Sequence, residues 1–199
     1  MASFKQKMLK AIYPLIMRLS KSSSRGKVLE NKQQAAAPAS FYDLASQLNS
    51  GQQLPFAQLK GKQVLLVNTA SNCGYTNQYT ELQQLAERFP NELVVLGFPA
   101  NDFAEQEKDD DQTINHFCQV NFGVSFPLMK KSVVVKQGAQ NAVYQWLTNA
   151  RQNGWNEQAP DWNFSKYLVS ADGKLTHYFG PAVSPLSEEV TGSVKITGS

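Results

Sequence analysis

Cys73 is the residue of this sequence best placed to act as a nucleophile. It follows a continuous apolar run, residues 64–67, of the kind found in strands buried on both faces of a parallel sheet. A thiol beyond the carboxyl end of such a strand, beside a helix amino terminus, lies where α/β proteins place their chemistry, and free backbone N–H groups there favour a thiolate. Taken alone, a buried cysteine is more often an inert core residue. Whether Cys73 is a nucleophile or an inert core residue therefore depends on the residues around it.

The segments after Cys73 predict a strand–helix–strand unit. Residues 77–89 place apolar side chains at i, i+3, i+4 and i+7, which indicates an amphipathic helix, and residues 93–98 form a second apolar run. The two strands are then parallel neighbours joined by a right-handed crossover, with their carboxyl ends at one edge. That edge carries Cys73 and the loop after Pro99.

A predicted hairpin brings a second group of residues to this edge. Residues 164–169 and 175–179 read as strands, and the turn at 171–174 between them is short enough to make them antiparallel. If the first of these strands runs antiparallel to the 64–67 strand, Trp162 and Asn163 face the thiol.

The remaining elements are expected to complete one α/β domain. We expect a short opening hairpin from Phe41, a helix after the aspartates 109–111, an extended segment over 125–135, a helix over 141–150 and a last helix starting within 184–190. The helix after the aspartates places Ile114, Phe117 and Cys118 on one apolar face.

Three segments, NTASNCGYT, LGFPANDFAEQE and WNFSKYLV, resemble in order and spacing the signature stretches of the glutathione peroxidase family. The resemblance covers roughly residues 41–190. It implies a thioredoxin-like fold of the α/β class, with a central mixed β-sheet flanked by helices. It also implies that Cys73 is the peroxidatic cysteine and that Gln106, Trp162 and Asn163 complete a catalytic tetrad.

The chemistry of these four side chains agrees with that resemblance. Peroxide reduction needs a thiolate that attacks one oxygen, while the other oxygen leaves and takes a proton; the product is a sulfenic acid. The carboxamides of Gln106 and Asn163 and the indole N–H of Trp162 are uncharged donors that can orient the peroxide and meet developing negative charge.

The resemblance also implies how the sulfenic acid is resolved. Phe117-Cys118 matches the resolving cysteine of two-cysteine members, which use thioredoxin rather than glutathione as reductant, and the short loop 152–161 implies a monomer. Taken alone, Cys118 reads as a core residue. Because a disulfide needs Cα atoms within about 7 Å, we expect the helix of Cys118 to unwind before a Cys73–Cys118 disulfide forms.

Two positions depart from the family pattern. Ala100 stands where the family has a cysteine, which removes an alternative resolving thiol, and Asp102 stands where the family has a glutamine. We expect Asp102 to place a carboxylate near the mouth of the site.

Other functions and cofactors are less compatible with the sequence. A general thiol–disulfide oxidoreductase would carry a C-x-x-C pair, and Thr76 replaces its second cysteine. A glutathione-dependent one-cysteine peroxidase and a non-enzymatic redox sensor or relay remain alternatives. We expect no metal or bound cofactor, because His116 and His177 form no ligand set at zinc spacing; the reducing co-substrate is thioredoxin or glutathione.

Charge divides the chain into two parts. Residues 1–30 hold seven Lys/Arg and one acid (7 − 1 = +6), whereas residues 31–199 hold twelve and fifteen (12 − 15 = −3). We expect residues 1–40 to be a basic tail and linker, either loosely ordered or an amphipathic segment that touches anionic lipid, and residues 41–199 to be the folded domain. Nothing indicates nucleic-acid binding. We expect a cytoplasmic protein, with periplasmic or membrane-associated locations as alternatives.

Overall fold

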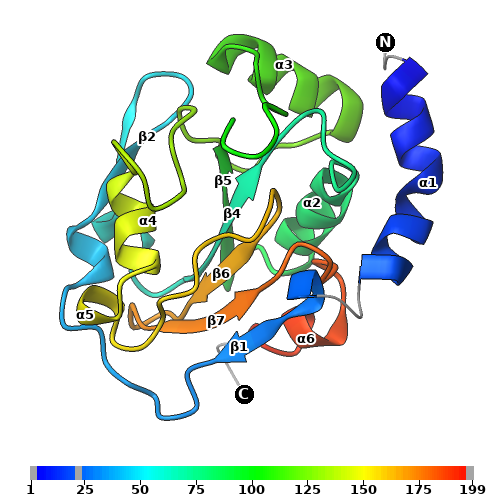
Figure 1. Ribbon diagram of the computed structural model, residues 1–199. Coiled ribbons are helices and arrows are strands. Elements are labelled where there is room, and N and C mark those ends of the chain that lie inside the picture. Colours follow the sequence, from blue (N-terminus) through cyan, green and yellow to red (C-terminus); the bar gives the residue numbers. More distant parts are fainter. Residues whose placement is uncertain (1–3, 21–23, 196–199) are drawn as a thin grey trace.

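The computed structural model describes residues 4–20 and 24–195, which are organised around a five-stranded mixed sheet (Figure 1). The strand order is β1-β7-β6-β4-β5. The strands are β1 (Val28–Glu30), β4 (Gln63–Thr69), β5 (Leu93–Pro99), β6 (Lys166–Val169) and β7 (Leu175–Phe179). Only β4 and β5 pair in parallel, and the other neighbours are antiparallel. The expected mixed sheet, crossover and antiparallel hairpin are confirmed.

Strand β4 is buried along its whole length. Leu65 and Val67 pack into the core on one face of the sheet, and Val64 and Leu66 pack into a second core on the other face. Because both faces are covered, the apolar residues of the strand show no alternation with polar ones.

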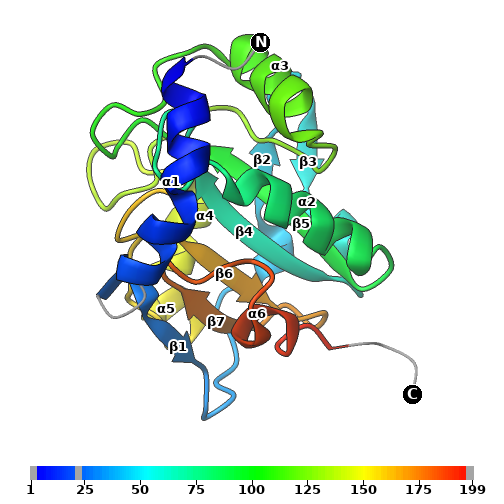
Figure 2. The ribbon, with the colours of Figure 1, turned by 90° about the vertical axis from the view of Figure 1, so that its right-hand side faces the viewer.

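Helices cover both faces of the sheet (Figures 1 and 2). The first core is covered by α1 (Phe4–Ser20), α2 (Gln78–Arg88), α3 (Asp111–Phe122) and α6 (Glu188–Thr191). The second core is covered by α4 (Ala142–Leu147), the short hairpin of β2 (Ala45–Gln47) and β3 (Gln53–Pro55), and two 3₁₀ turns, η2 (Phe41–Asp43) and η3 (Phe56–Leu59). A further one-turn helix, α5 (Ala150–Asn153), follows α4.

The segment expected to be a linker is instead packed on the domain. A 3₁₀ turn, η1 (Ser24–Gly26), leads into β1, which pairs with β7 at the edge of the sheet. Gly154 has φ +98°, and a Cβ there would lie 2.3 Å from the carbonyl oxygen of Ala36, so only glycine allows the chain to pass so closely. The sequence did not indicate this because β1 is three residues long and gains its order from its partner strand.

Of the three remaining elements, one differs from expectation. The helix expected over 141–150 ends at Leu147, because Thr148 caps it, and α5 is separate. Residues 125–135 are extended, as expected, and form isolated bridges, for example Gly97 with Leu128. The last helix, the four-residue α6, starts at Glu188, within the expected range 184–190. Among the described residues, no helix combines the length and the hydropathy needed to cross a bilayer.

Candidate active site

Cys73 lies in the turn between β4 and α2 and is 1% exposed. Its backbone N–H donates to Thr76 Oγ1 at 3.0 Å, and the Thr76 hydroxyl lies 2.9 Å from the carbonyl oxygen of Ala70. The backbone N–H of Tyr75 donates to Cys73 Sγ at 3.4 Å. The turn therefore fixes the thiol and aims one backbone donor at it, as expected for a thiol just before a helix.

The charge state of Cys73 results from two opposing effects. Burial raises the pKa of the thiol above its ordinary value, while hydrogen bonds from Tyr75 N–H and from the side chains of Trp162 and Asn163, together with the charge of Arg25, lower it. Burial is the larger effect. The donors expected to favour the thiolate are present, but they offset only part of the cost of removing it from water.

The structure brings together the four residues expected to form the tetrad. Asn163 Nδ2 donates to Gln106 Oε1 at 2.9 Å, and both Trp162 and Asn163 interact with the thiol of Cys73. Asn163 is fully buried. Two uncharged side-chain donors thus reach the thiol, and Gln106 is joined to them through Asn163. This arrangement can stabilise a thiolate and bind a small polar substrate without a histidine.

Asn68 positions the segment that carries Trp162 and Asn163. This buried residue of β4 donates from Nδ2 to the carbonyl oxygen of Trp162 at 3.0 Å, and its Oδ1 accepts from Ser165 N–H at 3.1 Å. Phe164 between them has φ 68°, a conformation that costs a non-glycine residue about 1–3 kcal/mol. Asn68 follows the apolar run 64–67 in the sequence, and a polar residue inside a strand that is buried on both faces is a signal that its side chain has a hydrogen-bond partner.

Two turns of the chain hold Gln106 next to Cys73. The carbonyl oxygen of Gln106 accepts from Asn72 N–H at 3.1 Å. The neighbouring carboxylate of Glu107 accepts from the backbone N–H and the hydroxyl of Ser71 at 2.9 and 3.0 Å. These hydrogen bonds hold the loop after β5 against the turn after β4. They thereby determine the position of Gln106, whose carboxamide contacts Asn163.

Comparison with known proteins assigns the chain to a family. A model described as glutathione peroxidase matches residues 41–148. Glutathione peroxidase-like peroxiredoxin 2 of Saccharomyces cerevisiae is 42% identical over 149 residues, which are 74% of this chain and 91% of that protein. The crystal structure of Trgpx in its apo form has a TM-score of 0.60 and 30% identity, over 80% of this chain and 98% of that one. The chain belongs to the glutathione peroxidase family.

A more distant structure agrees with the fold. A thioredoxin family protein described as a thiol:disulfide interchange protein, from Chlorobium tepidum, has a TM-score of 0.54 at 13% identity, over 81% of this chain and 97% of that one. With the mixed sheet and its flanking helices, this likeness confirms the thioredoxin-like α/β fold expected from the sequence.

The second cysteine of this glutathione peroxidase family member has different surroundings. Cys118 is fully buried on α3, and both cysteines are free thiols. Burial raises the pKa of the Cys118 thiol to about 12; a hydrogen bond with Tyr79 lowers it and the charge of Glu107 raises it. In this arrangement Cys118 is an un-ionised core thiol, as its apolar helix face indicated.

The two departures from the family pattern have structural roles. Ala100 is fully buried in the second core. Asp102 Oδ2 accepts from Val134 N–H at 2.7 Å. The carboxylate of Asp102 therefore anchors the segment 125–135 to the active-site loop.

Arg25 is a site residue that the sequence did not indicate. Its guanidinium carbon lies 4.9 Å from the centroid of the Trp162 ring. The Phe103 ring packs against the same indole at a tilt of 46°, with 5.6 Å between the ring centroids. Arg25 comes from η1, outside the matched family segment. No pattern in its own segment distinguishes it from the other basic residues there.

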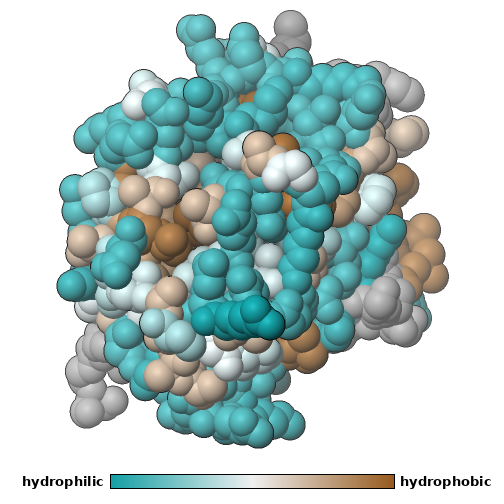
Figure 3. Space-filling view, turned by 60° about the vertical axis from the view of Figure 1, so that its left-hand side comes forward, coloured by the Kyte–Doolittle hydropathy of each residue, from teal (hydrophilic) through white to brown (hydrophobic). Residues whose placement is uncertain are grey.

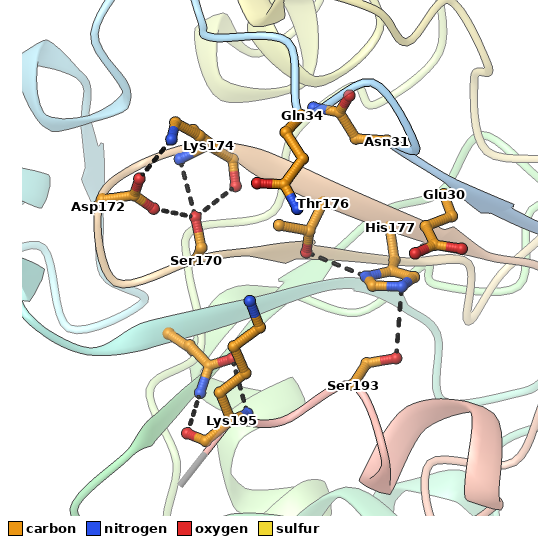
Figure 4. A pocket seen from close by; sticks show the side chains of 11 residues that line it. Glu30, Asn31, Gln34, Ser170, Asp172, Lys174, Thr176, His177, Ser193 and Lys195 are labelled. Carbon is orange, nitrogen blue, oxygen red and sulfur yellow. Dashed lines mark hydrogen bonds and ion pairs between the residues drawn. The ribbon is translucent and has the colours of Figure 1, made fainter. Parts of the chain in front are cut away.

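A separate cavity of about 170 Å³ lies at the other end of the central strand (Figure 4). It is lined by Gln63, the first residue of β4, and by His177, whose pKa is lowered by burial. His177 Nδ1 lies 3.0 Å from Thr176 Oγ1, and its Nε2 lies 3.5 Å from Ser193 Oγ (Figure 4). Since Cys73 follows the opposite end of β4, this cavity does not belong to the peroxidase site.

Proposed function

We propose that this protein is a thiol peroxidase that reduces hydrogen peroxide and organic or lipid hydroperoxides. The observation that carries the proposal is the interaction of Trp162 and Asn163 with the thiol of Cys73, with Gln106 held to Asn163 by a 2.9 Å hydrogen bond between the two carboxamides. Membership of the glutathione peroxidase family supports it.

In the first step the Cys73 thiolate attacks one peroxide oxygen. The S–O bond forms as the O–O bond breaks, so the sulfur is oxidised by two electrons to a sulfenic acid and the peroxide is reduced. The second oxygen leaves as hydroxide or alkoxide and takes a proton to become water or alcohol. Gln106, Trp162 and Asn163 lie in position to hold the thiolate and to donate hydrogen bonds to the leaving oxygen.

In the second step the Cys118 thiol attacks the Cys73 sulfur. A disulfide forms, and the sulfenic oxygen leaves as water. Two electrons from the dithiol of thioredoxin then restore both thiols. The name peroxiredoxin carried by the Saccharomyces cerevisiae relative supports a thiol-based reductant of this kind, and the short loop 152–161 supports a monomer.

A coupled assay tests the proposal. Full-length protein is incubated with a hydroperoxide and NADPH, together with either thioredoxin and its reductase or glutathione and its reductase. We expect steady NADPH consumption with thioredoxin, much less with glutathione, and none for Cys73→Ser. No consumption with any hydroperoxide in either system would contradict a peroxidase and leave the sensor alternative.

Cys118→Ser separates the two kinds of peroxidase. We expect this variant to consume one equivalent of peroxide per chain and then to stop when thioredoxin is the reductant. If the variant continues to cycle with glutathione at the rate of the unmodified protein, the protein is a one-cysteine, glutathione-dependent enzyme.

A further inference from the structure

Helix α1 presents an apolar stripe to solvent. Met8, Ile12, Leu15 and Leu19 recur at intervals of four, three and four residues, which places them on one face of the helix. Their side chains are 49%, 39%, 58% and 69% exposed. Among the described residues, the other exposed large apolar side chains are scattered singly: Val28, Val120 and Leu186.

The opposite face of α1 is already in contact with the domain. Tyr13 is 6% exposed, its hydroxyl donates to Glu81 of α2 at 2.6 Å, and Ile16 and Met17 pack against the first core. Figure 2 shows α1 lying across this side of the molecule. Helix α1 therefore has two apolar faces: one packs against the domain, and the other, the stripe, is exposed to solvent.

Another face of the protein provides a comparison with the stripe. The side that carries β2, α4 and α5 comes forward in Figure 3; it is mostly hydrophilic, and its apolar atoms form small patches. Single exposed apolar residues are ordinary, whereas a continuous row of four marks an interaction site.

The charge around the stripe identifies its occupant. Residues 1–21 contain five basic residues and no acid, and those basic residues are Lys5, Lys7, Lys10, Arg18 and Lys21. A second copy of this chain would bring two such segments together, with like-charge repulsion. An anionic lipid surface provides both an apolar layer for the stripe and negative headgroups for the basic residues.

We propose that α1 docks this protein onto anionic membrane surfaces, lying in the interface with its Met8–Leu19 stripe among the acyl chains. The docked helix is next to the active site, because a Cβ on Gly74, the neighbour of Cys73, would lie only 3.0 Å from Ile16 Cδ1. Docking therefore places the Cys73 site beside the lipid. The proposal concerns binding and does not depend on the peroxidase reaction.

Vesicle co-sedimentation of the full-length protein tests this docking. We expect at least about tenfold tighter binding to vesicles that contain phosphatidylserine than to vesicles of phosphatidylcholine alone, and weaker binding at high salt. The double variant Leu15→Ser/Leu19→Ser should lose at least about tenfold of that binding. The matched control Val120→Ser/Leu186→Ser removes two exposed apolar side chains outside α1 and should bind like the unmodified protein.

Three results would overturn the proposal. The first is absence of binding to either vesicle, and the second is an equal loss of binding in the stripe variant and the control variant. The third is a stable dimer in solution, measured by light scattering, that only the stripe variant disperses; the stripe then belongs to a second copy. Hydrogen peroxide turnover, measured on the same preparations, reports separately on folding and on the proposed function, because failed turnover leaves the vesicle result standing.

Discussion

The guanidinium of Arg25 stacks on the indole of Trp162, with 4.9 Å between the guanidinium carbon and the ring centroid. The contact joins the N-terminal segment to the residue that precedes Asn163 in the active site. Arg25 also lowers the pKa of the Cys73 thiol through its charge. One side chain from outside the matched family segment thus helps to hold a donor of the site and favours the thiolate.

Replacing Arg25 by Gln should slow the reaction of Cys73 with peroxide. A cation–π contact is worth about 0.5–1 kcal/mol, so we expect a two- to fivefold loss (about 0.5–1 kcal/mol in RT ln units) at neutral pH. Because the charge that lowers the pKa is gone, the rise of reactivity with pH should move to higher pH. Stopped-flow reduction of hydrogen peroxide across a pH series measures both effects.

Lys27→Gln is the matched control for Arg25. It removes the same charge from the same segment. The Lys27 ammonium group donates to Gln158, whereas the guanidinium of Arg25 lies over the indole of Trp162. Equal losses in the two variants would mean that Arg25 acts only through the net charge of the segment.

Glu107 should make the stability of the fold depend on pH. Its carboxyl is fully buried, and burial raises its pKa from 4.5 to about 7, with Ser71 lowering it. Between these two values the folded protein holds a proton that the unfolded chain releases, so the free energy of unfolding falls as pH rises from about 4.5 to about 7. The full effect is up to about 3 kcal/mol. Urea unfolding at a series of pH values measures it.

Glu107→Gln should remove most of this slope, because glutamine does not titrate in the window. Glu105→Gln is the matched control, since Glu105 is exposed and pairs with Lys108 on the surface; its slope should equal that of the unmodified protein. A slope that survives in Glu107→Gln would assign the titration to another group.

Much of the fold and of the tetrad followed from the sequence, because strong local patterns specify them. The run that became β4 is continuous in the sequence and buried on both faces in the structure. The antiparallel pairing of β6 with β4 then had to place Trp162 and Asn163 at the Cys73 end. These placements depend on strand direction. The lengths of the connections predict that β4 and β5 are parallel and that β6 and β7 are antiparallel, whereas the direction of β6 against β4 is seen only in the structure.

The parts that did not follow from the sequence depend on single long-range contacts. Asn68 looks like the end of a strand until its two bonds to the segment 162–165 are seen. Arg25 is one of seven basic residues among residues 1–30, and β1 is three residues long. In each case the partner lies more than ninety residues away, so no pattern within the segment itself indicates the contact.

Tyr13 should control how firmly α1 is held. Glu81 accepts from Tyr13 at 2.6 Å and from Ser184 at 2.6 Å, so one carboxylate joins α1, α2 and the chain before α6. Tyr13→Phe removes a hydrogen bond to a charged group, worth about 1.5–3 kcal/mol. We expect amide exchange within α1 to accelerate by at least about tenfold (1.4 kcal/mol), with little change in β4.

Tyr42→Phe is a suitable control for Tyr13, because it removes a hydroxyl that donates to Ala171 at 2.6 Å on another part of the domain. It should leave exchange within α1 unchanged. If Tyr13→Phe also leaves it unchanged, the apolar contacts of Ile16 and Met17 hold the helix without the hydrogen bond.

Disulfide formation should loosen α3. Cys118 lies fully buried in the middle of this helix, with its pKa raised to about 12, so it neither ionises readily nor meets solvent while the helix is intact. We therefore expect one equivalent of hydrogen peroxide to accelerate amide exchange across α3 by at least about tenfold, through local unfolding that delivers the sulfur to Cys73.

Helix α2 provides the internal control for this measurement, and its amide exchange should be unchanged. In Cys118→Ser the same treatment should leave a sulfenic acid that dimedone traps, with α3 unchanged. Exchange across α3 that stays as slow in the disulfide form as in the reduced form would show that the sulfurs meet without unwinding, and a helix of this length would then have to shift as a rigid body.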